Sequence, residues 1–146
     1  MQVEGQVTFA ATPDRVWQVL RDRDALKKAI PGCETLQETG PGRYQAALKL
    51  GIAAVKGSYT AEVSITEERA PSHYRLKIAG QGGPGFVNME GDVDLSPAGA
   101  QTAVGYKFDV QVGGVIAAVG QRMLGGVGKM LAADFFKAMQ QAAEGA

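Results

Sequence analysis

Apolar and polar residues alternate with a period of two over residues 3–9, 43–50, 58–66, 74–78, 87–95 and 104–112, and residues 33–37 form a weaker seventh stretch. A period of two places successive side chains on opposite faces of a strand. The six stretches after residue 9 are separated by short connections rich in glycine and proline, so we expect them to pair antiparallel. The pattern predicts a sheet of about seven strands with one apolar face.

The pattern changes to steps of three and four over residues 115–142, which predicts a long helix. Its apolar stripe consists of Ile116, Val119, Met123, Val127 and Met130, widened by Gly120, Leu124, Leu131, Phe135 and Ala138. Gln121, Arg122, Lys129 and Gln140 lie opposite the stripe. Gly120, Gly125, Gly126 and Gly128 each cost about 1 kcal/mol relative to alanine inside a helix. Either the helix backbone lies close to the sheet, or the missing side chains keep a space open beside it.

Two short helices are predicted between the first and second strands. Thr12 is a suitable N-cap, and Pro13 fits the first helical position because its missing N–H has no partner there in any case. A second helix starts near Asp24 and ends before Pro31 and Gly32.

Only the C-terminal helix is long enough to cover the apolar face of the sheet. The sequence therefore predicts an α+β protein, with a curved antiparallel sheet wrapped around this helix in a single domain over residues 1–146. Small inward residues, among them Ala46, Ala61 and Gly91, are expected to leave a mostly apolar cavity, closed at one end by the two short helices.

Composition limits the partners and the compartment. Fifteen basic and fifteen acidic residues give a formal charge of zero, so no global field attracts nucleic acid or an anionic membrane. The single cysteine, Cys33, cannot form an intrachain disulfide and fits a reducing compartment. The N-terminus lacks the basic start and apolar run of a signal peptide, and charges at positions 122, 129 and 134 interrupt the long helix. We expect a cytoplasmic protein, peripheral at the inner membrane face at most.

Few residues are suited to catalysis or metal binding. With one histidine and one cysteine, no His/Cys metal set is available, and we expect neither a metal nor a covalent cofactor. His73 is either a surface residue or a general base, and Cys33 is either a small buried side chain or a nucleophile. The glycines over residues 80–85 are not followed by a helix, so they form a flexible lip or a hairpin turn and not a dinucleotide site.

The acidic candidates are Glu90, Asp92 and Asp94, which fall on the polar face of their strand, and Asp134. By helical phase Asp134 lies either near the pocket end of the helix or, where the helix leaves the sheet, in water.

The cavity is the better candidate site. Its expected lining is Leu26, Ile30, Tyr44, Leu48, Tyr59, Phe86, Met89, Tyr106, Phe108, Met123, Val127 and Met130. The aromatic rings would stack on a planar ligand or fill a core, and the methionines would form an adaptable wall or ordinary packing. The apolar loop at residues 51–55 is a candidate docking surface or pocket lid.

Several motifs together resemble one protein family over nearly the whole chain. They are Pro13-Asp14-Arg15-Val16-Trp17, Ile30-Pro31-Gly32-Cys33, Lys56-Gly57-Ser58-Tyr59, Gly80-Gln81-Gly82 with Gly85-Phe86, Gly113-Gly114, Val119-Gly120-Gln121-Arg122 and Phe135-Phe136. This set resembles the CoxG family of carbon monoxide dehydrogenase subunits, within the START/Bet v 1-like (SRPBCC) superfamily. The resemblance implies a helix-grip fold with an apolar cavity. It also implies association with a molybdenum carbon monoxide dehydrogenase or a related hydroxylase, recruitment of that enzyme to the membrane, and handling of its quinone.

Three functions follow as hypotheses. The first is a non-catalytic carrier that binds a quinone or similar lipid and passes it between membrane and redox enzyme. The second is an assembly or recruitment factor whose pocket is incidental. The third is an enzyme of the same fold that acts on an aromatic or polyketide-like substrate with Tyr44, Tyr106 or Asp134 as acid or base. Because the chain ends at Ala146, soon after the helix, we expect transient membrane contact through residues 51–55 or the glycine-rich turn.

Overall fold

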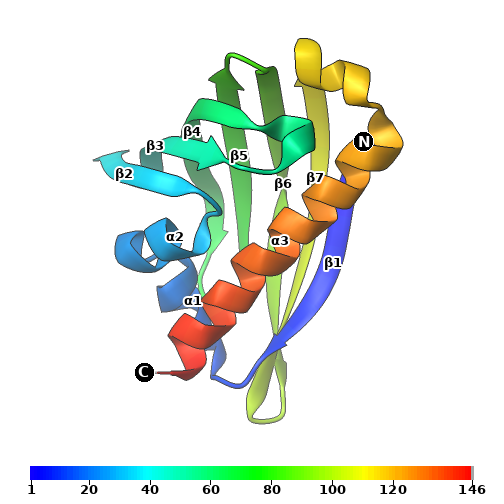
Figure 1. Ribbon diagram of the computed structural model, residues 1–146. Helices are drawn as coiled ribbons and strands as arrows, with labels where there is room; N and C mark the ends of the chain where they lie inside the picture. The colour runs from blue at the N-terminus through cyan, green and yellow to red at the C-terminus, as the bar shows by residue number, and fades with distance from the viewer. Residues whose placement is uncertain (146) are drawn as a thin grey trace.

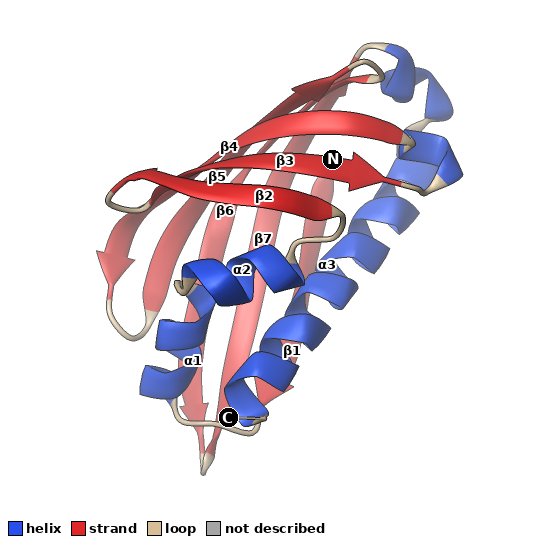
Figure 2. Cartoon of the chain, turned by 60° about the vertical axis from the view of Figure 1, so that its left-hand side comes forward, coloured by secondary structure: helices blue, strands red, loops and turns tan. Residues whose placement is uncertain are grey.

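The computed structural model describes residues 1–145 and has the predicted α+β architecture (Figures 1 and 2). Its elements in order are β1 (Gln2–Phe9), α1 (Pro13–Leu20), α2 (Arg23–Ala29), β2 (Cys33–Gly40), β3 (Arg43–Leu50), the 3-10 helix η1 (Ala53–Val55), β4 (Gly57–Arg69), β5 (His73–Gly82), β6 (Gly85–Ala98), β7 (Gln101–Gly113), the 3-10 helix η2 (Val115–Val119) and α3 (Gln121–Glu144). The seven strands form one antiparallel, curved sheet, as the alternation predicts.

The sheet has two free edges, and the helices lie between them. The strand order is β1-β7-β6-β5-β4-β3-β2, so β1 and β2 are the edge strands. The helices α1 and α2 connect these two edges along the chain. The long helix α3 crosses the concave side and packs against β1, α1 and α2 (Figure 1). The sheet and helices therefore enclose one concave face.

Capping side chains begin both short helices. The backbone N–H of Arg15 donates to Thr12 Oγ1 at 3.3 Å, and that of Ala25 donates to Asp22 Oδ2 at 2.9 Å. Thr12 is thus the predicted N-cap, with Pro13 in the first turn of α1. The second helix begins slightly earlier than expected because Asp22 is its cap.

The glycine-rich stretch between β5 and β6 is mostly strand. A Cβ at Gly82 would lie 2.1 Å from the Ser58 carbonyl oxygen, and one at Gly85, where φ is +139°, would lie 2.1 Å from the Gly113 carbonyl oxygen. These glycines permit close strand pairing, so the turn itself contains only residues 83 and 84. Of the two interpretations of this stretch, the hairpin turn is the one confirmed.

The prediction that one helix spans residues 115–142 is wrong at its beginning. Residues Val115–Val119 form η2, and α3 begins only at Gln121. Gly120 separates them with a φ of +97°, a conformation that side chains other than glycine rarely adopt. The predicted stripe continued a helical phase across this break, which is why its phase in α3 is incorrect. The buried residues of α3 are Leu124, Phe136, Met139 and Ala143.

The space around two glycines of α3 shows which of them is required by close packing against the sheet. A Cβ at Gly128 would lie 3.1 Å from Val3 Cγ2 on β1, so here the helix does approach the sheet closely. A Cβ at Gly126 would meet no atom within 4 Å, since this position faces open space. Close approach therefore explains Gly128 and not Gly126.

Two apolar clusters hold the layers together at opposite ends. The main cluster, at the α1 end, includes the fully buried Phe9, Leu20, Val104 and Met139. The smaller cluster joins η1, η2 and the first turns of α3 through Val55, Ile116 and Leu124. Between these clusters the concave face is less completely covered.

Candidate functional site

The least covered part of the concave face lies on β5 and β6. Tyr74, Leu76 and Ile78 alternate onto this face of β5, and Ile78 is paired with Met89 of β6. Tyr74 is buried, whereas Leu76, Ile78 and Met89 are only half-buried although they point toward the helix side of the sheet. An inward apolar side chain that remains accessible must border a space that solvent reaches.

Six of the half-buried apolar side chains on this face define what we call the inner apolar surface. They are Leu48, Leu76, Ile78, Val87, Met89 and Val112. The packing of α3 explains why they are uncovered. Its second half buries Phe136, Met139 and Ala143, but its glycine-rich first half buries only Leu124. The helix packs most closely on β1 and α2, and so leaves the centre of the sheet accessible.

Small residues do not create this surface in the way we expected. Ala46 and Ala61 are buried, and they face one another across β3 and β4. The position of a Cβ on Gly91 is occupied, because the Phe108 ring carbon Cδ1 lies 2.6 Å from it. Gly91 thus permits close packing of Phe108, and the prediction that it opens a cavity is wrong.

Nine of the twelve predicted lining residues lie on or near the concave face. Leu48, Met89 and Tyr106 are half-buried there, and Tyr44, Tyr59 and Phe108 are buried in the same face. Leu26 is a buried residue of α2, Ile30 is the C-cap of α2 and is half-buried, and Val127 packs against the cluster of η1 and η2.

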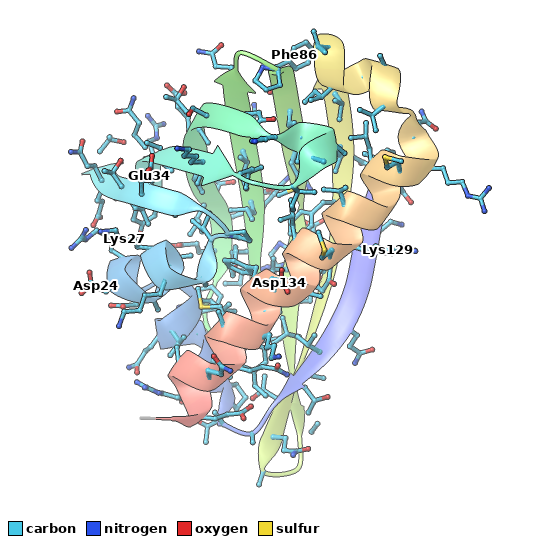
Figure 3. The ribbon with its side chains drawn as sticks, in the orientation of Figure 1. Asp24, Lys27, Glu34, Phe86, Lys129 and Asp134 are labelled. Atoms are coloured by element: carbon cyan, nitrogen blue, oxygen red, sulfur yellow. The ribbon has the colours of Figure 1, made fainter. Side chains whose placement is uncertain are left out.

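The other three predicted residues are on the outside of the molecule. Phe86 precedes the inward Val87 on β6, so it faces the convex side, where its ring lies over Gly113 and remains 44% exposed (Figure 3). Met123 is 58% and Met130 is 43% exposed on the outer face of α3. The prediction that these three side chains line the cavity is wrong. For the methionines the cause is the helical phase carried across Gly120.

The aromatic residues build the walls of the site more than its floor. Tyr106 stacks on Phe136 with ring centroids 4.5 Å apart and on Phe108 at 5.9 Å. The hydroxyl of Tyr59 donates to the Val55 carbonyl at 2.5 Å and ties η1 to β4. Burial raises the pKa of Tyr59 and of Tyr106 above the ordinary phenol value, so both stay neutral near pH 7.

The acid and base candidates are not brought together. Tyr44 donates to the Arg21 carbonyl at 3.4 Å, near the α1 end, whereas Asp134 is exposed on α3 (Figure 3). His73 Nδ1 is 2.7 Å from Asp94 Oδ1, on the convex side. Cys33 is half-buried, and burial raises the pKa of its thiol despite the opposing charge of Lys27, so it is not an activated nucleophile.

The three acidic residues of β6 lie on the solvated face, as expected. Sequence reasoning missed that they are paired there, since Arg75 contacts Glu90 at 3.1 Å and Asp92 at 3.2 Å. Within residues 1–145, no group of three or more His, Cys, Asp or Glu side chains is arranged to hold a metal ion.

Two shallow hollows are open to solvent, and they share only Leu48 with the inner apolar surface. One is lined by Asp24, Lys27, Lys28, Ile30, Gly32 and Cys33, and the other by Glu34, Ala47, Leu48, Ser58, Tyr59, Thr60, Gln81 and Gly82. Of these residues, Asp24, Lys27 and Glu34 are labelled in Figure 3. The first lining is largely charged, and the second mixes polar side chains with Ala47, Leu48 and Tyr59. Because both hollows are open to solvent, neither favours a buried apolar ligand or a defined reaction.

One family model matches almost the whole chain. The family model for CoxG, a carbon monoxide dehydrogenase subunit, matches residues 5–144. The chain belongs to the CoxG family. Curated proteins give no match to this CoxG family member.

Solved structures place this CoxG family member among START/Bet v 1-like folds. A conserved protein from Geobacillus kaustophilus is 45% identical, with a TM-score of 0.96 over 99% of this chain and 95% of that one. A START superfamily protein from Mycobacterium smegmatis is 16% identical, with a TM-score of 0.77 over 98% and 97% of the two chains. The Zhui aromatase/cyclase from a Streptomyces species is 21% identical, with a TM-score of 0.69 over 99% and 93%. Family and fold are consistent with hydrophobic-ligand binding, and the fold also includes enzymes.

Proposed function

We propose that this CoxG family member is a non-catalytic carrier that binds a quinone or a similar lipid. The observation that carries the proposal is the inner apolar surface, whose inward side chains remain accessible beneath the glycine-rich half of α3. Water against such a surface is unfavourable by about 25 cal/mol per Å² of apolar area, so an apolar ligand that replaces it gains free energy. Tyr106 is half-buried on the same concave face, where its neutral hydroxyl lies over Gly5 of β1 and can donate a hydrogen bond.

We further propose that the carrier serves a molybdenum carbon monoxide dehydrogenase or a related hydroxylase. Family membership supports this partner. An assembly or recruitment factor with no ligand role remains the alternative. The two accounts differ in their dependence on the inner apolar surface, because only the carrier requires it. The dispersed positions of Tyr44, Tyr106 and Asp134 do not favour an enzyme.

A pair of neighbouring substitutions tests the carrier. Ile78→Trp places a large side chain on the inner apolar surface, whereas Lys77→Trp places the same side chain on the convex face of β5. We expect Ile78→Trp to weaken uptake of an added short-chain quinone roughly tenfold, as the added volume displaces it. Lys77→Trp should leave uptake unchanged. Native mass spectrometry and quinone titration measure both, and thermal melts report folding.

The same pair separates carrier from recruitment factor. Protein purified from its own host is extracted with organic solvent, and the extract is analysed for quinones and prenyl lipids. The rate of substrate-dependent quinone reduction by the hydroxylase is then measured in the presence of the wild type, Ile78→Trp or Lys77→Trp, and the three rates are compared. Wild-type protein that contains no lipid and refuses added quinone would exclude the carrier. Equal support of the hydroxylase by both variants would favour recruitment.

A further inference from the structure

The outer face of α3 carries apolar and small residues that are exposed to solvent. Met123 is 58% and Met130 is 43% exposed, and Gly126 and Ala133 are exposed on the same side of the helix. A Cβ at Gly126 would meet no atom within 4 Å. Glycine is among the least favourable residues inside a helix, and packing within one chain does not require it here. Close approach of a second helix from outside the fold would explain Gly126.

These four residues, which we call the α3 stripe, have the spacing of a two-helix coiled coil. Met123 and Met130 are seven residues apart, as are Gly126 and Ala133, and each small residue follows a methionine by three. In the heptad abcdefg the methionines occupy position a and the small residues position d. Met130 of a second helix would enter the hole between Gly126 and Ala133, where small side chains let the two backbones approach closely.

The charges that flank the α3 stripe have opposite signs on its two sides. Lys129 precedes Met130 at position g, whereas Asp134 follows Ala133 at position e (Figure 3). Both side chains are exposed, and within residues 1–145 neither is within ion-pair distance of an opposite charge. In a parallel pair of helices, position g of one helix faces position e five residues later on the other. Lys129 would therefore meet Asp134 of a second copy, and two-fold symmetry would form this contact twice.

The same charges select the orientation and the occupant. An antiparallel pair would place each flank against the same flank of the other copy, so that Arg122 and Lys129 would face their own counterparts and repel them. The parallel pair joins opposite charges instead. A partner helix needs small residues and both charges at matching positions, and α3 itself supplies all of them. The zero formal charge of the chain adds no general repulsion between copies.

We propose that the outer face of α3 is an interface at which two copies of this chain form a parallel, two-fold symmetric pair. The α3 stripe packs on its counterpart, and Lys129 forms an ion pair with Asp134 of the other copy. Lys137 occupies the next position a, where a lysine lowers stability but fixes the register and the number of helices. The proposal goes beyond the carrier function and does not depend on it, because this face of α3 points away from the sheet (Figure 1).

Sedimentation equilibrium of the wild type tests whether the pair forms. The face from Met123 to Lys137 is about 21 Å long at 1.5 Å per residue. Because so short an interface is smaller than those of stable dimers, we expect weak association, with half of the chains paired at roughly 0.1 mM. A wild-type chain that remains monomeric at about 1 mM overturns the proposal.

Two charge reversals test the ion pair. Lys129→Asp places two carboxylates together at each contact, and Asp134→Lys places two ammonium groups together, so each variant alone should self-associate roughly tenfold more weakly or worse. An equimolar mixture of the two variants should associate as the wild type does, because every aspartate then faces a lysine. Lys77→Asp, an equal charge change on the convex face of β5, should leave association unchanged. A mixture that associates no better than its components overturns the proposed register.

An engineered disulfide tests the parallel orientation. In a Cys33→Ser background, Ala133→Cys places two thiols opposite one another at position d, and mild oxidation should give a covalent dimer. An antiparallel pair of the α3 stripe would place Ala133 opposite Met123 instead. Gln45→Cys, at an exposed position on β3, should remain monomeric under the same conditions. Equal cross-linking at positions 133 and 45 overturns the proposal.

The apolar contribution is tested by Met130→Glu. The Met130 side chain is exposed, so the variant should melt at the wild-type temperature, and we expect it to remain monomeric where the wild type is paired. Wild-type association that Met130→Glu leaves undiminished would show that the copies meet through another surface, and this result also overturns the proposal.

Discussion

Tyr74 is a buried residue whose ionisation depends on its packing at the α1 end of the molecule. Its ring meets Trp17 edge to face with centroids 5.6 Å apart, and its side chain is fully enclosed. Burial raises the pKa of Tyr74 far above the usual 10.0, with a small opposing effect from Arg21. The phenol therefore remains neutral in the folded protein at pH values where the same group ionises in the unfolded chain.

This difference predicts a loss of stability in alkali. The stabilisation from Tyr74 is fully present below the unfolded pKa of 10.0 and is lost as the pH rises toward the folded pKa, because the unfolded state then releases a proton that the folded state retains. Above pH 10.0, one such group lowers the free energy of unfolding by about 1.4 kcal/mol per pH unit. Urea unfolding of wild type and Tyr74→Phe on both sides of this pH measures it. Equal pH slopes for the two proteins would contradict the assignment.

Single-residue positions were predictable from the sequence where the alternation of a strand was unbroken. Met89 and Phe108 face inward because each belongs to a regular run of alternating residues. Phe86 was misplaced, because the glycines beside it suggested a long turn, whereas the tight hairpin keeps it in the strand. The alternation over residues 74–78 places Ile78 on the inward face, but its accessibility depends on where α3 packs. The periodicity of a strand carries no information about the position of a distant helix.

At the scale of one element, the glycines of α3 differ in their surroundings. Gly126 and Gly128 are two residues apart in the same helix, yet one faces solvent and the other contacts Val3. The sequence predicted the helix and its glycine content but not its beginning, since a positive φ at Gly120 is not visible as a change in hydrophobic periodicity. Which glycine is required by packing depends on the distance to β1.

Alanine substitutions at these two positions are a matched pair. We expect Gly126→Ala to raise the free energy of unfolding by about 1 kcal/mol, because it improves helix propensity with no contact to disturb. Gly128→Ala should gain less or lose stability, since its Cβ would lie 3.1 Å from Val3 Cγ2 and one of the two must move. Chemical denaturation of both variants compares them. A larger gain at position 128 would show that α3 does not rest on β1 as described.

The whole molecule has a tightly packed end and a loosely packed one. The fully buried Phe9, Leu20 and Met139 all belong to the main cluster, at the α1 end, whereas the buried members of the smaller cluster next to η1 and η2 are only Val55, Ile116 and Leu124. The sequence predicted the sheet, the helix order and closure by the short helices. It could not predict this gradient, which arises from contacts between segments far apart in the chain.

Hydrogen exchange should reveal this difference in packing between the two ends of the molecule. We expect amides near Val93 and Val104 to exchange far more slowly than those of η1, η2 and the β5–β6 hairpin, because local opening is easiest where few apolar side chains are buried. Bound quinone should slow exchange at the second set and leave the first unchanged. Uniform protection along the chain, or slowing confined to the α1 end, would contradict this account.

The two edge strands β1 and β2 give the sheet a consequence of its own. All other strands are held on both sides by backbone hydrogen bonds, but between β1 and β2 only helices span the distance. They do so through side-chain packing and side-chain hydrogen bonds, among them Gln140 Nε2 to the Thr8 carbonyl of β1 and Arg23 to the Leu36 carbonyl of β2. Side-chain contacts slide by small amounts at low cost, whereas a hydrogen-bonded ladder does not. The seam between β1 and β2 is therefore where the width of the sheet can adjust, and in a carrier of the proposed kind ligands of different thickness would be accommodated there without any strand changing register.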